Sequence, residues 1–408
     1  MNLTAPDPET GSQGTVVVIS SVHWHFNWQR HHDIASRLAA RGYDVFFVEP
    51  LPKRWPGLGE ARRVFGRLSG HSTVSGGGRQ REVAGVDLVS PLLLPDVGRF
   101  CRAINRSLFV PLLARRLKRR IVSRPLIVLD YLPISSSVAL LRSLEPDLAV
   151  YDCVWDWSSD PHSALETIRE KELLAEVDLV LTDSPFLFDK MKRSHPRTRR
   201  ILPAVDLSVF GPPDRPGQAD AGSPLCGYFG QLGANIDFEV MRLLSQRFRL
   251  RLIGPVEAPL DGFGSRTEVL GSVPREKLPE LLRDIDVLVL PYKREGHTRG
   301  VIPAKTFECL ATGKPTVAIG LASLSEFGDL FHLCDTTEQF LEAVSRAAGD
   351  PPALRQRRIQ TARANSWEER IEEVEEALHT ALAEKGWPLP DSDAPPPRAA
   401  AGPLESEA

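Results

Sequence analysis

The segment from Arg299 to Gly320, RGVIPAKTFECLATGKPTVAIG, combines residue types that could bind a nucleotide. It predicts a short helix that carries Glu308, then a Gly-Lys-Pro turn, then an apolar strand. The first amides of a helix are unpaired donors with a partial positive charge, which suits a phosphate. A carboxylate accepts hydrogen bonds from paired hydroxyls such as those of a ribose. The pattern therefore predicts a site for a nucleotide sugar.

Further residues suit the diphosphate of such a ligand. Lys305, close to the start of the predicted helix, is a movable point charge for phosphate, although an ordinary solvated lysine is the alternative. Glycines follow another predicted strand at 230 and 233, where they would let backbone amides approach a phosphate; a plain turn explains them equally well. The predicted donor-binding residues from this pattern are Glu308, Lys305, Pro303, Gly230 and Gly233.

A second group of polar and aromatic residues follows the first predicted strand, in the loop 23–30, HWHFNWQR. Loops at strand ends often carry function, aromatic rings stack on sugar faces, and polar side chains bind hydroxyls or anions. A packed loop that closes the sheet edge is the alternative. The residues predicted to face an acceptor are His23, Trp24, Asn27, Trp28, Gln29 and Arg30.

Acid–base catalysis needs a titratable side chain within reach of the reacting hydroxyl. Asp156 follows a later strand, in YDCVWDW, and is predicted to orient an acceptor hydroxyl or to act as a base. A structural role as a cap is the alternative for the nearby Asp152. His25 is the second catalytic candidate. Because the histidines of the loop 23–30 lack an acidic or thiol partner at ligand spacing, we predict no metal and no cofactor.

The order of strands and helices supplies the frame for these residues. TVVVIS at 15–20 is a β-branched run without alternation, which is typical of a strand buried on both faces. A helix around 34–39 and a strand at 43–48 complete one βαβ unit. After the Pro-rich stretch 212–224 the pattern starts again. Two doubly wound α/β halves are therefore predicted, with ligands at the carboxyl ends of their strands.

The domain boundaries follow from the breaks in this pattern, and the terminal stretches are polar and rich in Pro and Ala. The predicted parts are a disordered N-terminus at 1–13, a Rossmann-like acceptor-side domain at 14–211, a linker at 212–224, a nucleotide-sugar-binding domain at 225–350, C-terminal helices at 351–386 and a disordered tail at 387–408.

Composition predicts a soluble globular protein of two domains. The chain has 408 residues, is 42% hydrophobic and has a formal net charge of −3, which gives no reason to expect nucleic acid as a partner. Its five cysteines are widely spaced without a CxxC pair, as is typical of free thiols in a reducing cytosol. The N-terminus does not resemble a signal peptide, and no apolar run predicts a membrane-spanning helix.

One segment departs from this nearly neutral charge. Residues 99–120, RFCRAINRSLFVPLLARRLKRR, are strongly basic and have apolar residues among the arginines. A basic amphipathic segment can lie on an anionic membrane surface, which would suit a lipid-linked acceptor. A core helix with a solvated basic end is the alternative.

Several segments, in their order and spacing, resemble glycosyltransferases of the GT-B fold, of the family 4 type (glycosyl transferases group 1). The resemblance covers roughly residues 15–385. It implies two Rossmann-like doubly wound domains that face each other across a cleft, with a C-terminal helix that crosses back to the first domain. Besides the Glu308 segment, it rests on VDLVLTDSPFL at 177–187, ILPAVDLSVF at 201–210, GYFGQL at 227–232 and VLGSVPREKLPELLRDIDVLVLPY at 269–292.

The donor segment departs from the family pattern at one position. The family usually has two glutamates seven residues apart; the second matches Glu308, and the first falls on Gly300. His297, Thr298 and Arg299 therefore become candidates for contact with the sugar or the phosphate.

Two further positions depart from the family. The family has basic residues after the glycines of its second domain, and the stretch 230–235 has none, so Arg299 or Lys305 would neutralise the diphosphate. The family commonly has a histidine near the reacting carbon in its first domain. Tyr131-Leu132-Pro133 occupies the comparable place.

The resemblance implies a hexosyltransferase-like enzyme. It would move a sugar from a nucleotide-diphosphate sugar, its co-substrate, to a hydroxyl of a polysaccharide, a glycolipid or a small metabolite, with retention and without a metal. A GT-B sugar-nucleotide epimerase and a non-catalytic GT-B partner protein are the alternatives. We expect a cytoplasmic protein that associates with the inner face of the membrane. The sequence leaves open the sugar, the nucleotide, the acceptor and the oligomeric state.

Overall fold

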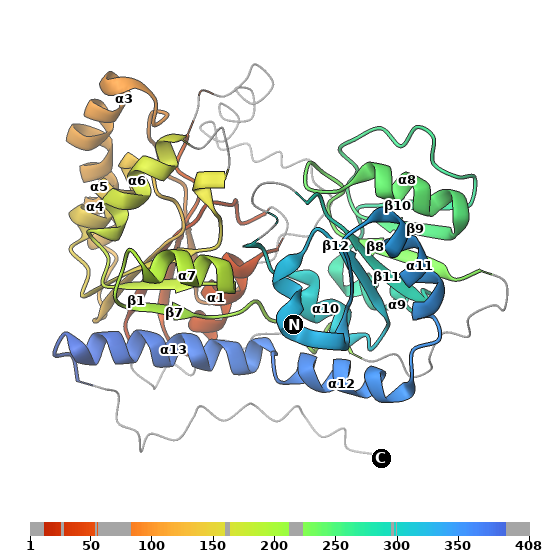
Figure 1. Cartoon of the computed structure of the whole chain (residues 1–408). Coiled ribbons are helices and arrows are strands. Elements are labelled where there is room, and N and C mark those ends of the chain that lie inside the picture. Colours follow the sequence, from red (N-terminus) through yellow and green to blue (C-terminus); the bar gives the residue numbers. More distant parts are fainter. Residues whose placement is uncertain are drawn as a thin grey trace, which may run out of the picture. The chain divides into compact units, whose positions relative to one another are not determined.

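The computed structural model divides the chain into two compact units (Figure 1). The amino-terminal unit comprises residues 2–152, 164–181 and 374–408, and the carboxy-terminal unit comprises 153–163 and 182–373. The predicted linker and both predicted disordered ends fall largely outside the described residues, so the predicted domain boundaries stay predictions. The structure describes residues 12–25, 28–53, 55, 83–159, 164–211, 223–294, 298 and 300–388.

The first sheet has seven strands in the order β3-β2-β1-β4-β5-β6-β7. All five residues of β1 are buried, because this strand lies between two neighbours and is covered on both faces. Thr15 of β1 pairs in parallel with Asp44 on one side and with Leu126 on the other. The carboxyl ends of β1, β4 and β5 therefore lie at one edge. The strands are β1 (Thr15–Ile19), β2 (Asp44–Val48), β3 (Val86–Val89), β4 (Leu126–Asp130), β5 (Leu148–Cys153), β6 (Leu179–Thr182) and β7 (Thr198–Arg200).

The first helix between these strands, α1 (Arg30–Ala40), is buried along almost all of its length. In α1 the buried residues include Ile34, Leu38 and Ala39, at helical spacing, and the chain turns at Gly42 with a φ of 94°, a conformation that favours glycine. A π-helical turn, η1, joins α3 and α4 into one continuous run. The helices are α1 (Arg30–Ala40), α3 (Gly98–Ile104), η1 (Asn105–Phe109), α4 (Val110–Lys118), α5 (Ser135–Leu144), η2 (Trp157–Ser159), α6 (Ala164–Leu174) and α7 (Pro185–Lys192).

The second sheet has six strands in the order β10-β9-β8-β11-β12-β13, and its paired strands are parallel. Val287 and Val289 of β11 belong to one hydrophobic cluster, whereas Leu288 and Leu290 belong to another. Since neighbouring side chains point to opposite faces, the sheet is buried on both. The strands are β8 (Leu225–Phe229), β9 (Arg249–Ile253), β10 (Thr267–Gly271), β11 (Val287–Pro291), β12 (Thr316–Ile319) and β13 (His332–Cys334).

Side-chain caps and a proline set the ends of the helices in the second unit. Asp237 accepts a hydrogen bond from the amide of Val240 at 3.1 Å, and Thr336 accepts one from Gln339 at 3.2 Å. The segment after β10 forms two short helices, because Pro279 has no amide hydrogen to continue the first. The helices are α8 (Phe238–Arg247), η3 (Arg275–Lys277), α9 (Leu278–Leu282), α10 (Lys305–Ala311), η5 (Ala322–Leu330), α11 (Thr337–Ala347) and α12 (Pro352–Arg363).

The last helix, α13 (Trp367–Glu384), contributes to both units. At its start the amide of Trp367 donates to Val205 O at 2.9 Å, and Ser366 Oγ caps the helix by accepting from the amide of Glu369 at 3.2 Å. Its second half belongs to the amino-terminal unit, where Arg41 pairs with Glu375 at 2.6 Å. The return of the C-terminal helix to the first unit, which the resemblance implied, is therefore observed.

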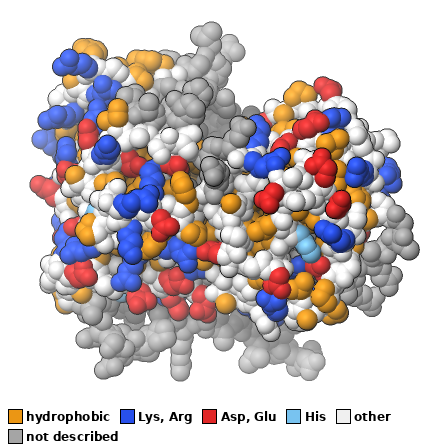
Figure 2. Space-filling view, in the orientation of Figure 1, with side chains coloured by type: hydrophobic (Ala, Val, Ile, Leu, Met, Phe, Trp, Pro, Cys, Tyr) orange, Lys and Arg blue, Asp and Glu red, His pale blue; other side chains and the backbone are white. Residues whose placement is uncertain are grey.

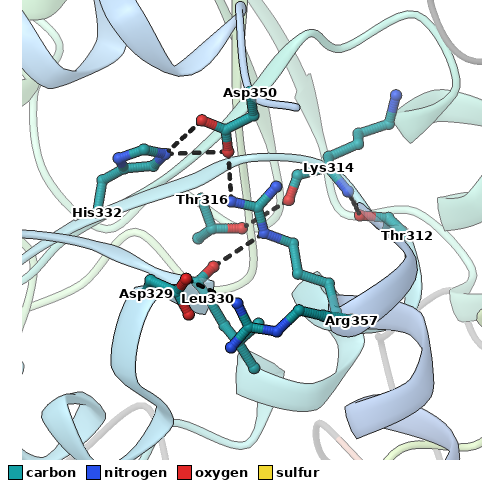
Figure 3. Close-up of polar contacts among 9 residues, drawn as sticks. Thr312, Lys314, Thr316, Asp329, Leu330, His332, Asp350 and Arg357 are labelled. Carbon is teal, nitrogen blue, oxygen red and sulfur yellow. Dashed lines mark hydrogen bonds and ion pairs between the residues drawn. The ribbon is translucent and has the colours of Figure 1, made fainter. Parts of the chain in front are cut away.

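A buried arginine ties α12 to the strand and helix before it. Arg358 is fully buried, its Nε donates to Leu330 O at 2.9 Å, and its guanidinium pairs with Asp350. His332 of β13 contacts the same carboxylate, with 3.0 Å between Nε2 and Oδ1 (Figure 3). The neighbouring Arg357 also forms an ion pair, 2.7 Å from Asp329, but these two side chains are 54% and 59% exposed.

These two adjacent arginines allow a matched comparison. Arg358→Met removes one partner of a buried charge pair, and we expect a loss of about 3–5 kcal/mol in the free energy of unfolding. Arg357→Met removes an exposed pair and is expected to cost at most about 1 kcal/mol. Urea denaturation of both variants measures the difference, and equal losses would contradict the structural role of Arg358.

Candidate functional site

Glu308 lies on α10, a helix of seven residues between β11 and β12. Phe307 and Leu310 are fully buried and fix this helix against the second sheet, whereas the side chain of Glu308 is 16% exposed. The amide of Thr306 already donates to Pro303 O at 2.9 Å. Because a helix dipole sums over aligned peptide units, so short a helix supplies little of it. The charge at this place comes from side chains rather than from the predicted helix amides.

Arg275 of η3, which the sequence analysis did not select, holds the carboxylate of Glu308. Its Nη2 donates to Glu308 Oε1 at 2.8 Å, and its guanidinium lies 5.5 Å from the ring centroid of Phe210. Burial raises the pKa of Glu308, and the charges of Arg275 and Lys305 oppose that rise. A carboxylate has two acceptor oxygens, so a cation on one leaves the other for a ligand hydroxyl.

The ammonium of Lys305 points into a group of aromatic rings. Nζ donates to Tyr228 Oη at 2.9 Å and lies 4.3 Å from the centroid of that ring. The rings of Phe229 and Tyr292 lie at 5.8 and 5.9 Å. Aromatic faces attract a cation without neutralising its charge. The side chain of Lys305 therefore lies close to Glu308, and its contact with a diphosphate stays a prediction.

Gly230 lies directly beside this ammonium. A Cβ atom at this position would come within 2.4 Å of Lys305 Nζ, and the φ of 117° is one that residues with side chains rarely adopt. The amide of Gly230, however, donates to Ile253 O at 2.8 Å. The expectation of a Gly230 amide open to a phosphate is therefore wrong, and what Gly230 provides is space next to Lys305.

Gly233 has a less suitable neighbour for a diphosphate. A Cβ atom there would lie 2.6 Å from Glu257 Oε2, so a carboxylate is close. Like charges repel at short range, which disfavours an anionic ligand at this position. The contact of Gly233 with a donor stays a prediction.

The structure gives a physical reason for the missing first glutamate. A Cβ atom at Gly300 would lie 2.3 Å from Phe186 Cδ1 and 3.0 Å from Phe186 Cβ, so the ring of Phe186 occupies the space that any side chain would need. Thr298 is buried, and its Oγ1 donates to Lys293 O at 2.5 Å. His297 and Arg299 lie outside the described residues, and their predicted contacts are untested.

In the amino-terminal unit the loop after β1 is held largely by its own packing. Trp24 is 3% exposed, and its ring lies 4.8 Å from Phe47 and 5.5 Å from Trp28. His23 and His25 are exposed. The interpretation as a packed loop therefore accounts for Trp24, whereas the two histidines face solvent. Asn27 lies outside the described residues.

Gln29 and Arg30 anchor the start of α1. The Gln29 amide donates to His32 Nδ1 at 3.0 Å, and His32 Nε2 contacts His23 O at 3.1 Å, so backbone groups occupy both ring nitrogens. Burial lowers the pKa of His32 to about 4. Arg30 Nε donates to the buried Asp152 Oδ2 at 2.8 Å. The structural interpretation of Asp152 is thus the one that the geometry supports.

Asp156 belongs to the carboxy-terminal unit and pairs with Lys190, with 2.7 Å between Oδ1 and Nζ. The same oxygen accepts from Ser158 Oγ at 2.6 Å. Burial would raise the pKa of Asp156, but the hydrogen bonds from Lys190 and Ser158 outweigh it and hold the pKa below its usual value. A lowered pKa makes a weaker base, so the geometry favours an orienting role over proton abstraction.

Sequence reasoning also missed Asp130, the last residue of β4. It is fully buried, and its Oδ1 accepts from the Leu132 amide at 2.8 Å. Burial raises the pKa of Asp130 to about 7. Its position at a strand end was a signal available in the sequence, since an acid that closes an apolar parallel strand faces the edge where ligands bind.

Comparisons with known proteins place these residues in a family context. The model of the family described as "Glycosyl transferases group 1" matches residues 224–350, which include Gly230, Arg275, Lys305 and Glu308. The resemblance predicted from the sequence is confirmed. A curated relative, a putative teichuronic acid biosynthesis glycosyltransferase from Bacillus subtilis (strain 168), is 25% identical over 217 residues; the match spans 46% of this chain and 54%, about half, of that protein.

Solved structures establish the fold. Sucrose-phosphate synthase from Thermosynechococcus elongatus aligns with a TM-score of 0.65 and 15% identity, over 91% of this chain and 100% of that one. Anabaena Alr3699/HepE in complex with UDP aligns with a TM-score of 0.59 and 11% identity, over 90% and 99% of the two chains. The chain has the GT-B fold, with two parallel-sheet Rossmann-like parts, as predicted.

The raised pKa of Asp130 makes stability depend on pH in a defined direction. An unfolded aspartate titrates near pH ~4, so the folded protein binds the extra proton between about pH 4 and 7, and stability falls as pH rises through this window. An asparagine at position 130 is uncharged at both ends of this pH window. We expect the melting temperature of Asp130→Asn, relative to the unaltered protein, to be higher at pH 8 than at pH 5.

The exposed Asp329 provides the control for this measurement. Arg357 lowers its pKa through a hydrogen bond, so Asp329→Asn is expected to show no such gain between pH 5 and pH 8. A pH-independent difference for Asp130→Asn would show that this carboxyl is already ionised at pH 5.

Proposed function

We propose that this protein is a retaining, metal-independent glycosyltransferase of the hexosyltransferase kind, which uses a nucleotide-diphosphate sugar. The observation that carries the proposal is the pairing of Glu308 with Arg275, close to the ammonium of Lys305, inside the region that the family model matches. In this arrangement Glu308 accepts the ribose hydroxyls, and Lys305 leaves its aromatic neighbours to meet the diphosphate. Arg299, Thr298, His297 and Pro303 stay proposed donor contacts.

The proposed reaction needs charge stabilisation more than covalent help from the protein. The bond between the anomeric carbon and the diphosphate oxygen breaks, and its electron pair leaves with the nucleoside diphosphate. The acceptor oxygen bonds to the anomeric carbon on the same face, and its proton passes to a base. Lys305 stabilises the charge that develops on the leaving diphosphate. His25 is the proposed base, and Asp156 is proposed to orient the acceptor.

For the acceptor we propose a cell-surface polysaccharide or a lipid-linked precursor of one. The support is the name of the curated relative, which refers to teichuronic acid biosynthesis. We propose that the enzyme works in the cytoplasm at the inner face of the membrane, and that it contacts the lipid through residues 99–120. Within the described residues, no helix is both long and apolar enough to span a bilayer.

One observation favours a second candidate, a non-catalytic GT-B partner protein. Gly300 stands where the resembled family has its first glutamate, and the ring of Phe186 lies beside it. A protein of this kind would bind a nucleotide sugar without transferring the sugar. Detection of sugar transfer to any acceptor would exclude a non-catalytic partner protein. It would also exclude a sugar-nucleotide epimerase, which uses no acceptor.

The first test concerns Glu308. Thermal shifts of the purified protein with UDP, GDP, TDP, ADP and CMP, and with their sugar conjugates, identify a ligand that binds the folded state. We expect Glu308→Ala to weaken the affinity for that ligand at least about tenfold, because a hydrogen bond to a charged acceptor contributes about 1.5–3 kcal/mol. Its melting temperature without ligand should stay within a few degrees.

The matched control is Glu342→Ala, which removes an exposed glutamate from the surface of α11. It should leave ligand affinity unchanged. If Glu308→Ala bound the nucleotide sugar as tightly as the unaltered protein does, the proposed site would be refuted.

A second test asks whether Arg275 controls the protonation of Glu308. Removing the guanidinium deletes a charge that opposes the raised pKa of Glu308. As pH falls, a protonated Glu308 accepts ribose hydroxyls less well, so affinity for the nucleotide sugar decreases. We expect this decrease to start at a higher pH in Arg275→Gln than in the unaltered protein, and Arg275→Lys to behave in between.

Isothermal titration with the nucleotide sugar measures this effect. The nucleotide sugar is preferable to the free diphosphate because a terminal phosphate itself titrates near pH ~6. Identical pH profiles for the unaltered protein and Arg275→Gln would mean that Arg275 does not control the charge of Glu308.

A further inference from the structure

We infer that the continuous run α3–η1–α4 docks on an anionic lipid bilayer through an apolar stripe flanked by arginines. The inference names the lipid-facing residues of the membrane contact proposed above and rests on that proposal. The stripe consists of Phe100, Leu108 and Leu112, which are 74%, 49% and 51% exposed. Large apolar side chains exposed in one run mark an interaction surface rather than a folding core.

The π-helical turn aligns these three side chains. In an uninterrupted α-helix of 3.6 residues per turn, Phe100 and Leu108 would point about 80° apart. The wider turn of η1 takes up about one extra residue and brings them onto nearly the same face. Leu112 follows Leu108 one turn later. The opposite face of α4 is buried through Val110, Leu113, Ala114 and Leu117, so the stripe points away from the sheet.

A buried asparagine holds the π turn in place. Asn105 Oδ1 accepts from the Leu94 amide at 2.9 Å, and its Nδ2 donates to Leu94 O at 2.7 Å. Nδ2 also donates to Ser136 Oγ at 3.2 Å. Asn105 is 1% exposed, so these bonds satisfy a buried amide and fix the phase of the helix on either side of it. The apolar stripe is therefore presented by a rigid element.

The charge around the stripe identifies the occupant. Between residues 97 and 129 the sequence contains no aspartate or glutamate. Five arginines of the run are exposed and have no acidic partner among the described residues, in contrast to Lys118 and Arg120, which pair with Glu145 and Asp87. Figure 2 shows Lys, Arg and hydrophobic side chains together on the surface over α3 and α4. The five exposed arginines without an acidic partner among the described residues are Arg99, Arg106, Arg115, Arg116 and Arg119.

These five guanidinium groups, beside exposed apolar side chains, match the two layers of a lipid surface. The arginines attract anionic headgroups, while aromatic and aliphatic side chains enter the boundary of the acyl chains. A soluble polyanion would use the arginines and leave the apolar stripe in water. A second copy of the chain would have to bring an acidic surface to the same place.

Sedimentation with vesicles tests the inference on the full-length protein. The probes are vesicles of phosphatidylcholine alone and vesicles of phosphatidylcholine and phosphatidylglycerol in equal parts. We expect binding to the anionic vesicles only. The substitutions Phe100→Ser, Leu108→Ser and Leu112→Ser together should weaken it at least about tenfold. A second variant should show a similar loss because each basic residue near the surface contributes to attraction; it combines Arg106→Ser, Arg115→Ser, Arg116→Ser and Arg119→Ser.

Matched controls carry the same kinds of substitution elsewhere on the surface and should bind as the unaltered protein does. The apolar control replaces Ile168, Val269 and Leu333, which are 56%, 45% and 39% exposed, with serine. The charge control replaces exposed arginines of other elements, Arg193, Arg199, Arg283 and Arg346, with serine. Melting temperatures close to that of the unaltered protein show that each variant is folded.

Four results would overturn the inference. They are absence of binding to anionic vesicles, equal losses in a variant and its control, loss in the arginine variant alone, and dissociation of an oligomer by the apolar variant. The third would point to a soluble polyanion and the fourth to a second copy of the chain. Thermal shifts with the nucleotide sugar are measured on the same samples. A sample that binds the nucleotide sugar but not the vesicles contradicts the lipid contact and leaves the proposed function standing.

Discussion

A carboxylate that is largely removed from water has to be paired, and Glu308 imposes this condition on the carboxy-terminal unit. Arg275 meets it from the helix after β10, and Lys305 adds a second positive charge from the first turn of α10. The pair fixes η3 against α10, and the ring of Phe210 packs on the guanidinium. The carboxylate of Glu308 is thus held in place by Arg275, which would reduce the cost of ordering it when a ligand binds.

Two glycines of the candidate site have a side chain of another element packed beside them. Phe186 takes the space beside Gly300, and Lys305 takes the space beside Gly230. In both cases a side chain from another element fills the place that the glycine leaves. The stretch after β8 lacks the basic residues of the family, and Lys305 is the cation that the structure places beside Gly230.

The amino-terminal unit uses buried charge differently. The Arg30–Asp152 pair joins the start of α1 to the end of β5, and backbone contacts occupy both ring nitrogens of His32. These bonds restrict the loop after β1, so His23 and His25 are presented to solvent from a fixed frame. On the outer surface of the same unit, five exposed arginines of the run 99–119 have no acidic partner among the described residues. Buried pairs thus order the start of α1, whereas these surface arginines are left for the proposed contact with an anionic lipid surface.

The sequence by itself determined the elements whose signals are local. The β-branched run of β1 and the helix–turn–strand segment around Glu308, with its strand at Thr316–Ile319, depend on neighbours a few residues away. Only the tertiary structure decided the partners of Glu308, Lys305 and Gly300. Arg275 precedes Glu308 by 33 residues, and Tyr228 precedes Lys305 by 77. Contacts of this kind depend on strand order and on which loops close together, and the periodicity of a single segment carries no information about either.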